Sequence, residues 1–354
     1  MTFSTFSIFV AFGVALTALS ALFTWLLLRR AGMMDVPNAR SSHTTPTPRS
    51  GGIAIVATFF IGWAALWALG DDVGVRQSSF AVLAGAALVL AAVSIADDLG
   101  ELGFRTKLLA QIAAAGALMA FGGVVDQITV PGVGGVALGW WGYPLTLVWI
   151  VGLTNAFNFM DGIDGIAAGT AVIAAGFFAA IAVDLGAVAT AWVSAIVVFA
   201  ALGFLLWNWP PAKIFMGDTG SQFLGFVLAG LAVMAVPGSG TGAGLGVPFW
   251  VMVVLFFHFI WDSAYTLVRR LRAGDNITQA HRSHLYQLMN RLGASHARVT
   301  GLYLLMGTLQ GLGAVVLVRL DGGWQMAVLV PFVAVQWFVT REVTRRAREA
   351  GLIG

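Results

Sequence analysis

The sequence predicts an all-α polytopic integral membrane protein with about eleven transmembrane helices. The first observation is composition: 59% of the 354 residues are apolar and 10% are charged, whereas a soluble domain has roughly 45–50% and about 25%. The second is that apolar segments recur along the whole chain, and about 20 such residues cross a bilayer as a helix. The third is the abundance of Trp and Gly, because Trp collects at bilayer interfaces and Gly lets helices approach closely. A soluble globular protein is therefore excluded.

The apolar segments form one transmembrane domain, residues 1–354, without a separate soluble domain. The first segment lacks a basic leading region and exceeds the roughly 7–15-residue core of a secretory signal, so we expect an uncleaved span. After the fourth segment, Ile128–Leu138 carries β-forming residues around Gly-rich turn residues, which predicts a small hairpin on the outer face or an unstructured loop. The predicted spans are Phe6–Leu28, Gly52–Leu69, Phe80–Ala96, Leu108–Val125, Pro144–Ala156, Ile166–Val183, Ala187–Trp207, Phe223–Val236, Val247–Val268, Val299–Val318 and Trp324–Thr340.

The basic residues predict the orientation, because Lys and Arg stay on the cytoplasmic side of short loops. With the N-terminus outside and the C-terminus inside, only Arg76 and Arg319 of the 19 basic residues fall outside. The inner face also receives most of the 16 acids and every His except His258, which lies within a span. We therefore expect the chemistry of this protein on the cytoplasmic face.

Two further features of the composition narrow the function. The chain has no Cys, which excludes disulfides, thiolate nucleophiles and Cys-ligated zinc or iron–sulfur centres. The net charge of +3 could indicate nucleic acid, but the Arg residues lie in loops beside spans, where topology already explains them. We predict no nucleic-acid partner.

Asp97 and Asp98 follow directly after the third predicted span, and Lys107 precedes the fourth. Two adjacent carboxylates at a membrane boundary need compensation by a metal, a basic partner or water. The pattern indicates a metal or phosphate site in which Lys107 faces the anion. The alternative is a solvated loop that begins with two acids.

Polar side chains recur at three-residue steps where the fifth predicted span ends, at Asn155, Asn158, Asp161 and Asp164. Residues at this spacing share one helical face. Carboxylates and amides are oxygen ligands that suit Mg²⁺ or Mn²⁺. The alternative is a polar turn between spans.

Asp218 repeats this pattern at the inner end of the seventh span, between Gly217 and Gly220. Thr219 and Ser221 can cap the helix that follows, and Asp218 could itself be only a cap. Three acidic clusters on one face favour a shared site instead.

The longest inner loop, residues 269–298, contains His281, Arg282 and His284. An anion-binding loop in which Arg282 grips phosphate is one interpretation. An amphipathic surface helix is another, and zinc would need a third ligand that the motif lacks.

The first inner loop, Asp35–Gly52, is too rich in Pro, Ser and Thr to be helical. It reads equally as a linker or as an anion-binding rim with Arg40, His43 and Arg49.

Taken in order, five motifs resemble those of the bacterial polyprenyl-phosphate N-acetylhexosamine-1-phosphate transferases, glycosyltransferase family 4. They are DVPNARSSHTTPTPRSGG, ADDLGELGFRTK, NAFNFMDGIDG, IFMGDTGS and HRSHLYQ, from about Met34 to Gln287. The HRSH form is similar to the enzymes that initiate O-antigen or capsule repeat units. It departs from the triple-His form of translocase I and the HxHH form of the enterobacterial-common-antigen initiator, which leaves the sugar open.

The resemblance implies transfer of a sugar 1-phosphate from a UDP-N-acetylhexosamine to undecaprenyl phosphate, with release of UMP. The donor would be UDP-GlcNAc or a 6-deoxy relative such as UDP-FucNAc or UDP-QuiNAc, and the product would initiate O-antigen or another envelope polysaccharide. The enzyme would be a multi-pass protein of the bacterial inner membrane, in contact with membrane lipids, with its active site on the cytoplasmic face. The oligomeric state stays open, with a homodimer as one option.

The resemblance also assigns roles to individual residues. Asp97 would face the lipid phosphate as candidate base or nucleophile, while Asp98 would orient Lys107 or the metal shell. Because a phosphate monoester is mostly dianionic at pH 7, we expect direct attack rather than a covalent aspartyl intermediate. The implied residues are Asp97 and Asp98 for catalysis, Asp218, Asn158 and Asp161 for Mg²⁺ or Mn²⁺, and Lys107, Asp164, His281, Arg282, His284 and Arg49 for substrate.

Two other functions stay open on the residues alone. A secondary transporter would place acids near mid-span with repeat symmetry, whereas these acids cluster at span ends on one face. A CDP-alcohol phosphotransferase would want DGxxAR followed by GxxxDxxxD, and the motif at Asp161 lacks the Arg and the tail.

Overall fold

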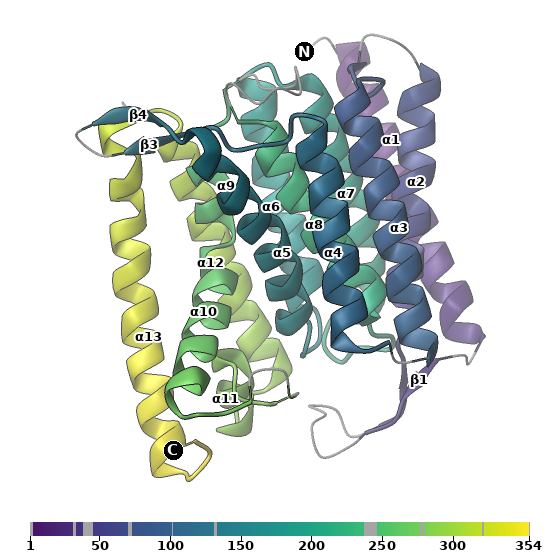
Figure 1. Ribbon diagram of the computed structural model, residues 1–354. Helices are drawn as coiled ribbons and strands as arrows, with labels where there is room; N and C mark the ends of the chain where they lie inside the picture. The colour runs from purple at the N-terminus through teal and green to yellow at the C-terminus, as the bar shows by residue number, and fades with distance from the viewer. Residues whose placement is uncertain are drawn as a thin grey trace.

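The computed structural model is a bundle of helices with two short two-stranded ribbons (Figure 1). It describes residues 3–30, 33–37, 45–69, 73–100, 102–130, 133–236, 246–276, 279, 281–320 and 322–353. The helices are α1 Phe3–Arg29, α2 Gly51–Leu69, α3 Ser78–Gly100, α4 Phe104–Ala120, α5 Gly142–Met160, α6 Ile166–Asp184, α7 Val188–Asn208, α8 Gly217–Met234, α9 Trp250–Leu255, α10 Phe257–Arg272, α11 Leu285–Arg291, α12 His296–Leu317 and α13 Leu329–Glu349. Two 3₁₀ segments, η2 Gly139–Trp141 and η3 Gly322–Val328, precede α5 and α13.

The fold class predicted from composition is confirmed: the chain is mostly helical and its helices suit a multi-pass membrane protein. Among the described residues, α1, α2, α3, α6, α7, α12 and α13 are long and apolar enough to cross a membrane. The number of crossings and the sides of the two termini stay predictions. The predicted ninth span is not continuous, because Phe256, with φ −107° and ψ 15°, separates α9 from α10.

Each ribbon joins residues that are close in sequence. Strands β3 Gln127–Val130 and β4 Gly134–Ala137 pair antiparallel, with Ile128 opposite Val136, within the stretch where the sequence predicts a hairpin or a loop. They lie at the same end of the bundle as the N-terminus (Figure 1). Strands β1 Met34–Asp35 and β2 Thr47–Pro48 pair near the other end.

Helix α8 forms the centre of the core and is buried along nearly its whole length. It packs against α5, α3 and α2. Small residues permit this, because helices without bulky side chains can approach closely. A Cβ on Gly225 would lie 2.8 Å from the Cα of Thr154 in α5. Helix α8 therefore packs closely against α5, α3 and α2.

The segment before α2 fixes the start of α8. Phe215 N–H donates to the Pro48 carbonyl over 2.7 Å, and Gly52 N–H donates to the Met216 carbonyl over 2.8 Å. Gly52 also faces Gly220 so closely that neither has room for a side chain. This contact brings the loop that precedes α2 to the first turn of α8.

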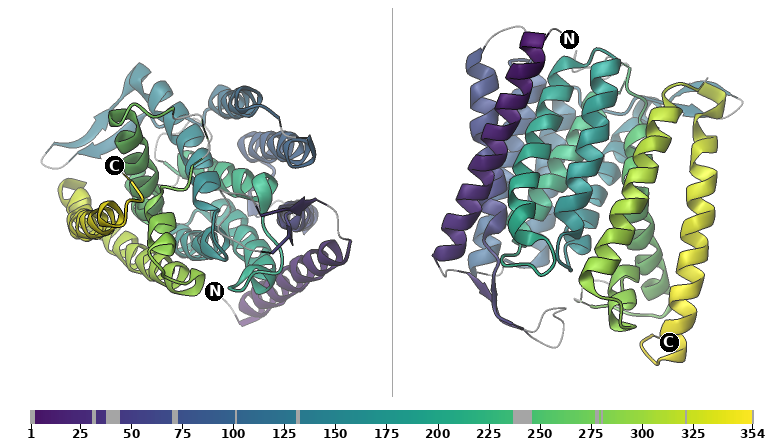
Figure 2. Two further views of the ribbon diagram at one scale, coloured as in Figure 1. Left: turned by 90° about the horizontal axis from the view of Figure 1, so that it is seen from below. Right: turned by 180° about the vertical axis from the view of Figure 1, so that it is seen from behind.

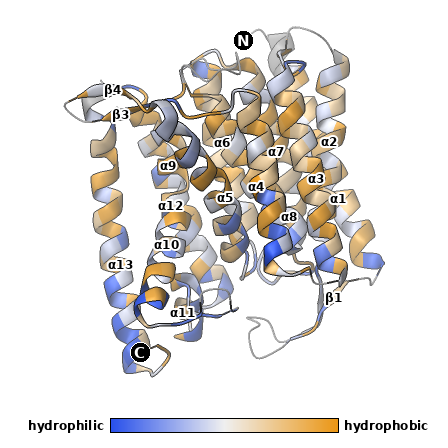
Figure 3. Cartoon of the chain, in the orientation of Figure 1, coloured by the Kyte–Doolittle hydropathy of each residue, from blue (hydrophilic) through white to orange (hydrophobic). Residues whose placement is uncertain are grey.

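Hydrophilic residues gather at the end of the bundle opposite β3 and β4. Figure 3 shows them at the lower ends of α4, α5, α8, α10, α11 and α13. Figure 2 shows α12 and α13 at one edge of the bundle and α1 toward the opposite edge, where it faces the viewer in the right panel. The polar end is where the candidate residues lie.

Candidate active site

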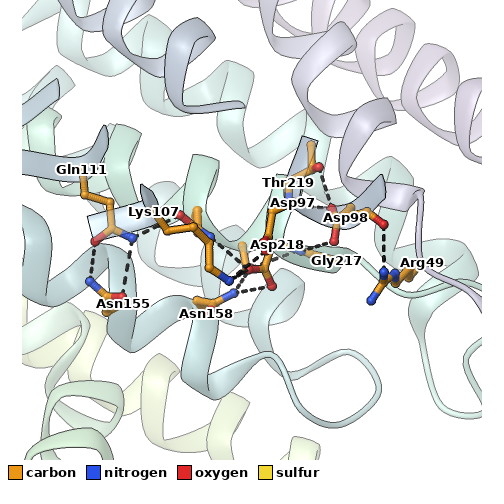
Figure 4. Close-up of polar contacts among 12 residues, drawn as sticks. Arg49, Asp97, Asp98, Lys107, Gln111, Asn155, Asn158, Gly217, Asp218 and Thr219 are labelled. Atoms are coloured by element: carbon orange, nitrogen blue, oxygen red, sulfur yellow. Dashed lines mark hydrogen bonds and ion pairs between the residues drawn. The ribbon is translucent and has the colours of Figure 1, made fainter. Parts of the chain in front are cut away.

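Lys107, near the start of α4, links two carboxylates that come from different helices. Its Nζ lies 2.8 Å from Oδ2 of Asp97 at the end of α3 and 2.8 Å from Oδ2 of Asp218 at the start of α8 (Figure 4). All three side chains are mostly buried. Because a single ammonium neutralises only one of the two negative charges, the trio stays attractive to a further cation.

Asp98 turns away from Lys107 and anchors the first turn of α8. Its Oδ1 accepts from the Asp218 N–H over 3.2 Å, and its Oδ2 accepts from the N–H of Thr219 over 3.0 Å and from its hydroxyl over 2.7 Å. An anion suits a helix N-terminus, where backbone N–H groups lack partners. Asp98 therefore acts on Asp218 through the backbone, and it is Asp97, not Asp98, that pairs with Lys107. The expectation that Asp98 orients Lys107 or the metal shell stays a prediction: its carboxylate bonds to the first turn of α8, which carries the candidate metal ligand Asp218, and not to Lys107.

Arg49 reaches the same place from the loop before α2. Its Nη2 donates to the Asp98 carbonyl over 2.8 Å. A Cβ on Gly217, whose φ is +69°, would lie 2.9 Å from Oδ2 of Asp98. Arg49 thus lies at the cluster. The anion-binding rim stays a prediction, and its other members, Arg40 and His43, fall outside the described residues.

Amide side chains surround Asp218 on the side away from Asp98. Asn158 at the end of α5 donates to its Oδ1 over 2.9 Å, and Gln222 donates to its Oδ2 over 3.1 Å. Gln111 and Asn155 extend this network, with a 2.6 Å bond from Asn155 Nδ2 to Gln111 Oε1 (Figure 4). The network fixes the Asp218 carboxylate in one orientation.

Asp161 follows directly after α5 and lies among other acids. Burial, then the negative charges of Asp218, Asp98 and Asp164, raise the pKa of its carboxyl well above the usual value. Within the described residues no hydrogen bond or ion pair to this side chain is found. A carboxyl in this position is where a bound cation is most stabilising.

The donor set suits Mg²⁺ better than a transition metal. Carboxylate and amide oxygens are present at Asp161, Asp218 and Asn158, and Mg²⁺ completes its shell with water and substrate phosphates. Among the residues that the structure describes, no three His, Asp or Glu side chains converge as a preformed metal cage. A metal here would therefore depend on the substrate for part of its shell.

Asp164 has a different setting from the other acids. Its Oδ1 lies 3.0 Å from Nδ1 of His296 at the start of α12, and its Oδ2 accepts from the Ala212 N–H over 3.0 Å. Although burial raises the pKa of Asp164, the bonds to His296 and Ala212 lower it below the usual value. Oδ1 ties the loop after α5 to α12, and Oδ2 ties it to the segment between α7 and α8, so the structure does not bring Asp164 into the Lys107 cluster.

The HRSH motif lies at the start of α11. His281 and His284 stack with ring centroids 4.9 Å apart, and His284 stacks on Phe159 from α5. Burial, then the positive charges around it, lower the pKa of His281 to about 4, so this ring is neutral at pH 7. Tyr286 fixes the motif to α5, because its hydroxyl donates to the Phe159 carbonyl over 2.9 Å.

Arginines on α10 hold the loop between α10 and α11 in place. Arg269 donates to the Ser283 carbonyl over 2.6 Å, and Arg270 donates to the carbonyls of Asn276 and Gln279. The Arg282 carbonyl accepts from Arg291 over 3.1 Å. The described part of the predicted loop is therefore held by hydrogen bonds to arginines, and α11 lies in its second part.

A cleft of about 550 Å³ separates the two groups of residues. One wall comes from α4, α5 and α8, and the other from α10, α11 and the loop between them. The polar lining residues are Lys107, Gln111, Asn155, Asn158, Gln222, Ser263, Thr266, Arg270, Gln279, His281, His284 and Gln287. Phe104, Leu108, Phe159 and Leu267 supply apolar surface between them. Such a cleft can take a ligand with a charged end and an apolar portion.

Sequence reasoning missed Asp262, which lies on α10 with 1% of its surface exposed. It accepts hydrogen bonds from the HRSH motif and from Tyr303 on α12. An acid in the middle of an apolar segment was the available signal, since such a group is unfavourable in a membrane unless it has partners. Gln111 and Gln222 were also missed, because a single amide residue within a helix forms no sequence pattern that indicates a site.

Comparison with known proteins shows similarity over most of the chain. The family model described as glycosyl transferase family 4 matches residues 80–236. A probable undecaprenyl-phosphate N-acetylglucosaminyl 1-phosphate transferase of Bacillus subtilis is 35% identical over 81% of this chain and 78% of its own length. A decaprenyl-phosphate N-acetylglucosaminephosphotransferase of Mycobacterium tuberculosis is 34% identical over 77% of this chain and 73% of its own. A phospho-N-acetylmuramoyl-pentapeptide-transferase of Halalkalibacterium halodurans is 47% identical over a shorter part, 32% of this chain and 35% of its own.

Proposed function

Because the chain belongs to the polyprenyl-phosphate N-acetylglucosamine-1-phosphate transferases of glycosyl transferase family 4, we propose that it transfers N-acetylglucosamine 1-phosphate from UDP-N-acetylglucosamine to undecaprenyl phosphate. An oxygen of the lipid phosphate forms a bond to the β-phosphorus of the donor. The bond from that phosphorus to the bridging oxygen breaks, and UMP leaves with the electron pair. The polyprenyl acceptor and the sugar are named in the relatives, and undecaprenyl is the chain length we propose here.

The observation that carries this proposal is Lys107 held between Asp97 and Asp218 at one wall of the cleft. Phosphoryl transfer between two anions depends mainly on charge neutralisation and alignment. Lys107 lines one wall of the cleft and Arg270 the other. Because the trio of Lys107, Asp97 and Asp218 carries one net negative charge, a bound divalent cation would supply the positive charge that lets phosphates from two substrates meet beside it. A transporter would not need two such walls at one end of the bundle.

The lipid phosphate needs little activation. Its second pKa is near 6, so it is mostly dianionic at neutral pH. Asp97 is already paired with Lys107 over 2.8 Å, which suits a residue that positions the ammonium. Direct attack is therefore favoured over a phosphorylated Asp97.

A divalent metal fits the donor set described above. Asp218 and Asp161, with Asn158, would hold Mg²⁺ or Mn²⁺, which when bound would neutralise the donor diphosphate. Lys107 would then remain beside the carboxylates as the fixed positive charge. Gln222 and Asn158 would keep Asp218 oriented through the bonds they already make.

The second wall is proposed to bind the sugar nucleotide. His281 lines this wall, is neutral at pH 7 and can hydrogen-bond sugar hydroxyls. Arg282, which follows His281 in the sequence, is suited to phosphate. The reaction is placed on the cytoplasmic face of the bacterial inner membrane, where the excess of Arg predicts this end of the bundle to lie. It would initiate an envelope polysaccharide, with O-antigen or capsule as the type that the HRSH form suggests.

The test is product analysis with the purified full chain in detergent. It would be incubated with undecaprenyl phosphate, Mg²⁺ and UDP-GlcNAc, UDP-FucNAc or UDP-QuiNAc in parallel. Release of UMP with formation of a lipid-linked sugar diphosphate is expected, fastest with UDP-GlcNAc. Preference for a 6-deoxy donor would overturn the sugar, and absence of UMP with every donor would overturn the reaction.

A further inference from the structure

Asp262 is a buried acid that lies outside the Lys107 cluster. It lies on α10, is 1% exposed and receives hydrogen bonds from two other elements. Burying a carboxylate is unfavourable unless hydrogen bonds or charges compensate it. Its partners therefore indicate what this carboxylate does.

Three of these partners belong to the HRSH motif and the first turn of α11. Nδ1 of His284 lies 3.1 Å from Oδ1 of Asp262. The Leu285 N–H donates to the same oxygen over 2.9 Å, and the Tyr286 N–H donates to Oδ2 over 3.2 Å. One carboxylate thus fixes three consecutive residues. Two further donors, the hydroxyls of Tyr303 and Thr266, hold the carboxylate itself.

The chemistry of these bonds decides the tautomer of His284. An ionised carboxylate can only accept hydrogen bonds. Besides His284, four donors already bond to Asp262, so its carboxylate acts as an acceptor to all of its partners. Nδ1 of His284 must therefore carry the proton. Nε2 is then the ring nitrogen that takes no part in the bond to Asp262, and in a neutral ring it bears a lone pair. His284 is one of the residues that line the cleft.

We propose that Asp262 is the positioning residue of the donor-binding wall, holding His284 with Nδ1 protonated so that Nε2 accepts a hydrogen bond from a hydroxyl or N-acetyl N–H of the sugar. The proposal rests on the proposed function for the identity of this ligand. Asp262 does not touch the substrate itself. It acts through His284, as the carboxylate partner of a functional histidine does in other sites.

The first measurement does not depend on activity. The chain has five histidines, so ¹⁵N-histidine labelling of the full-length protein in nanodiscs gives few imidazole signals. Those of His284 are identified by their loss in His284→Gln. At pH 8 we expect Nδ1 protonated and Nε2 unprotonated in the wild type, with the proton moving wholly or partly to Nε2 in Asp262→Asn. A wild-type His284 protonated on Nε2 would overturn the proposal.

The second measurement separates positioning from a merely structural role. Asp262→Asn should raise KM for UDP-GlcNAc by about 10- to 100-fold while KM for undecaprenyl phosphate changes little. Tyr303→Phe is the matched control, since it removes a donor to the same carboxylate and none from the motif, so KM should rise by about fivefold or less. In a His284→Ala background, Asp262→Asn should add almost nothing, because residues acting through one contact are not additive.

The outcomes distinguish this inference from the proposed function. If the wild type transfers no sugar phosphate, the proposed function fails and the His284 tautomer still decides the role of Asp262. The wild type can instead be active while Asp262→Asn changes the two KM values and kcat in the same proportions as Tyr303→Phe does. In that case Asp262 has only a structural role. Should Asp262→Asn not fold, the wild-type tautomer and the His284→Ala KM remain decisive.

Discussion

The anchoring of α8 by Asp98 can be tested by Asp98→Asn, which keeps the shape and removes the charge. The carboxylate accepts bonds of 3.2, 3.0 and 2.7 Å from Asp218 and Thr219. Each hydrogen bond to a charged group contributes about 1.5–3 kcal/mol. An Asn has one acceptor oxygen, so at least one of these donors faces an NH₂ group, and the remaining bonds lose the charge.

We therefore expect a loss of about 3–4 kcal/mol in the anchoring of the first turn of α8. Because this turn carries Asp218, turnover should fall by the corresponding factor, roughly 100- to 1,000-fold. Thr219→Val removes only the 2.7 Å hydroxyl bond and should lower turnover about tenfold. The assay is initial-rate release of UMP at saturating substrates.

The matched control is Asp184→Asn at the far end of α6. Asp184 pairs with Arg319 over 2.8 Å where both side chains are largely exposed, and such pairs contribute little. Turnover of this variant should match the wild type. The reasoning is refuted if Asp98→Asn retains more than about a third of wild-type turnover, since α8 would then be held without that carboxylate.

Three further predictions concern packing, titration and charge. Gly52→Ala should lower Tm markedly because its Cβ would meet the backbone of Gly220, whereas a Cβ on Gly85 has nothing within 4 Å, so Gly85→Ala should leave Tm unchanged. The pKa of His281 is about 4 in the folded protein, against 6.5 for an ordinary histidine. The unfolded chain therefore binds this proton at a higher pH, and the free energy of unfolding should fall as pH drops from 6.5 to 4. His281→Asn should flatten this pH dependence in thermal unfolding curves. Lys107→Met should abolish UMP release, while Lys107→Arg, which keeps the charge but not the geometry, should retain a measurable fraction; equal rates in the two variants would contradict the role of its charge.

The sequence predicted which residues meet better than how they meet. Asp97, Lys107, Asn158 and Asp218 lie at helix ends that topology places on one face, so their proximity follows from the order of spans. The pairing of Lys107 with Asp97 and not with Asp98 depends on the rotation of α3 about its axis. That rotation is set by tertiary packing, which apolar periodicity does not report for a helix that is apolar on all sides.

Asp164 and Asp262 both have hydrogen-bond partners far away in the sequence, which sequence patterns do not reveal. The three-residue pattern groups Asp164 with Asn158 and Asp161, whereas its carboxylate bonds to Ala212 and His296. Asp262 was overlooked because no charged neighbour in sequence explains it, and most of its partners, His284 and Leu285 among them, follow more than twenty residues later in the chain. Long-range partners of single acids become visible only in the folded chain.

The most direct test of the central claim follows the β-phosphate of the donor. UDP-N-acetylglucosamine labelled with ³²P at the β position would be given to the purified protein with undecaprenyl phosphate and Mg²⁺, and to Asp218→Ala in parallel. Transfer of a sugar 1-phosphate predicts that the label enters the lipid fraction with unlabelled UMP released, and that Asp218→Ala shows neither. Label that remains in released UDP, with sugar alone on the lipid, would contradict the account.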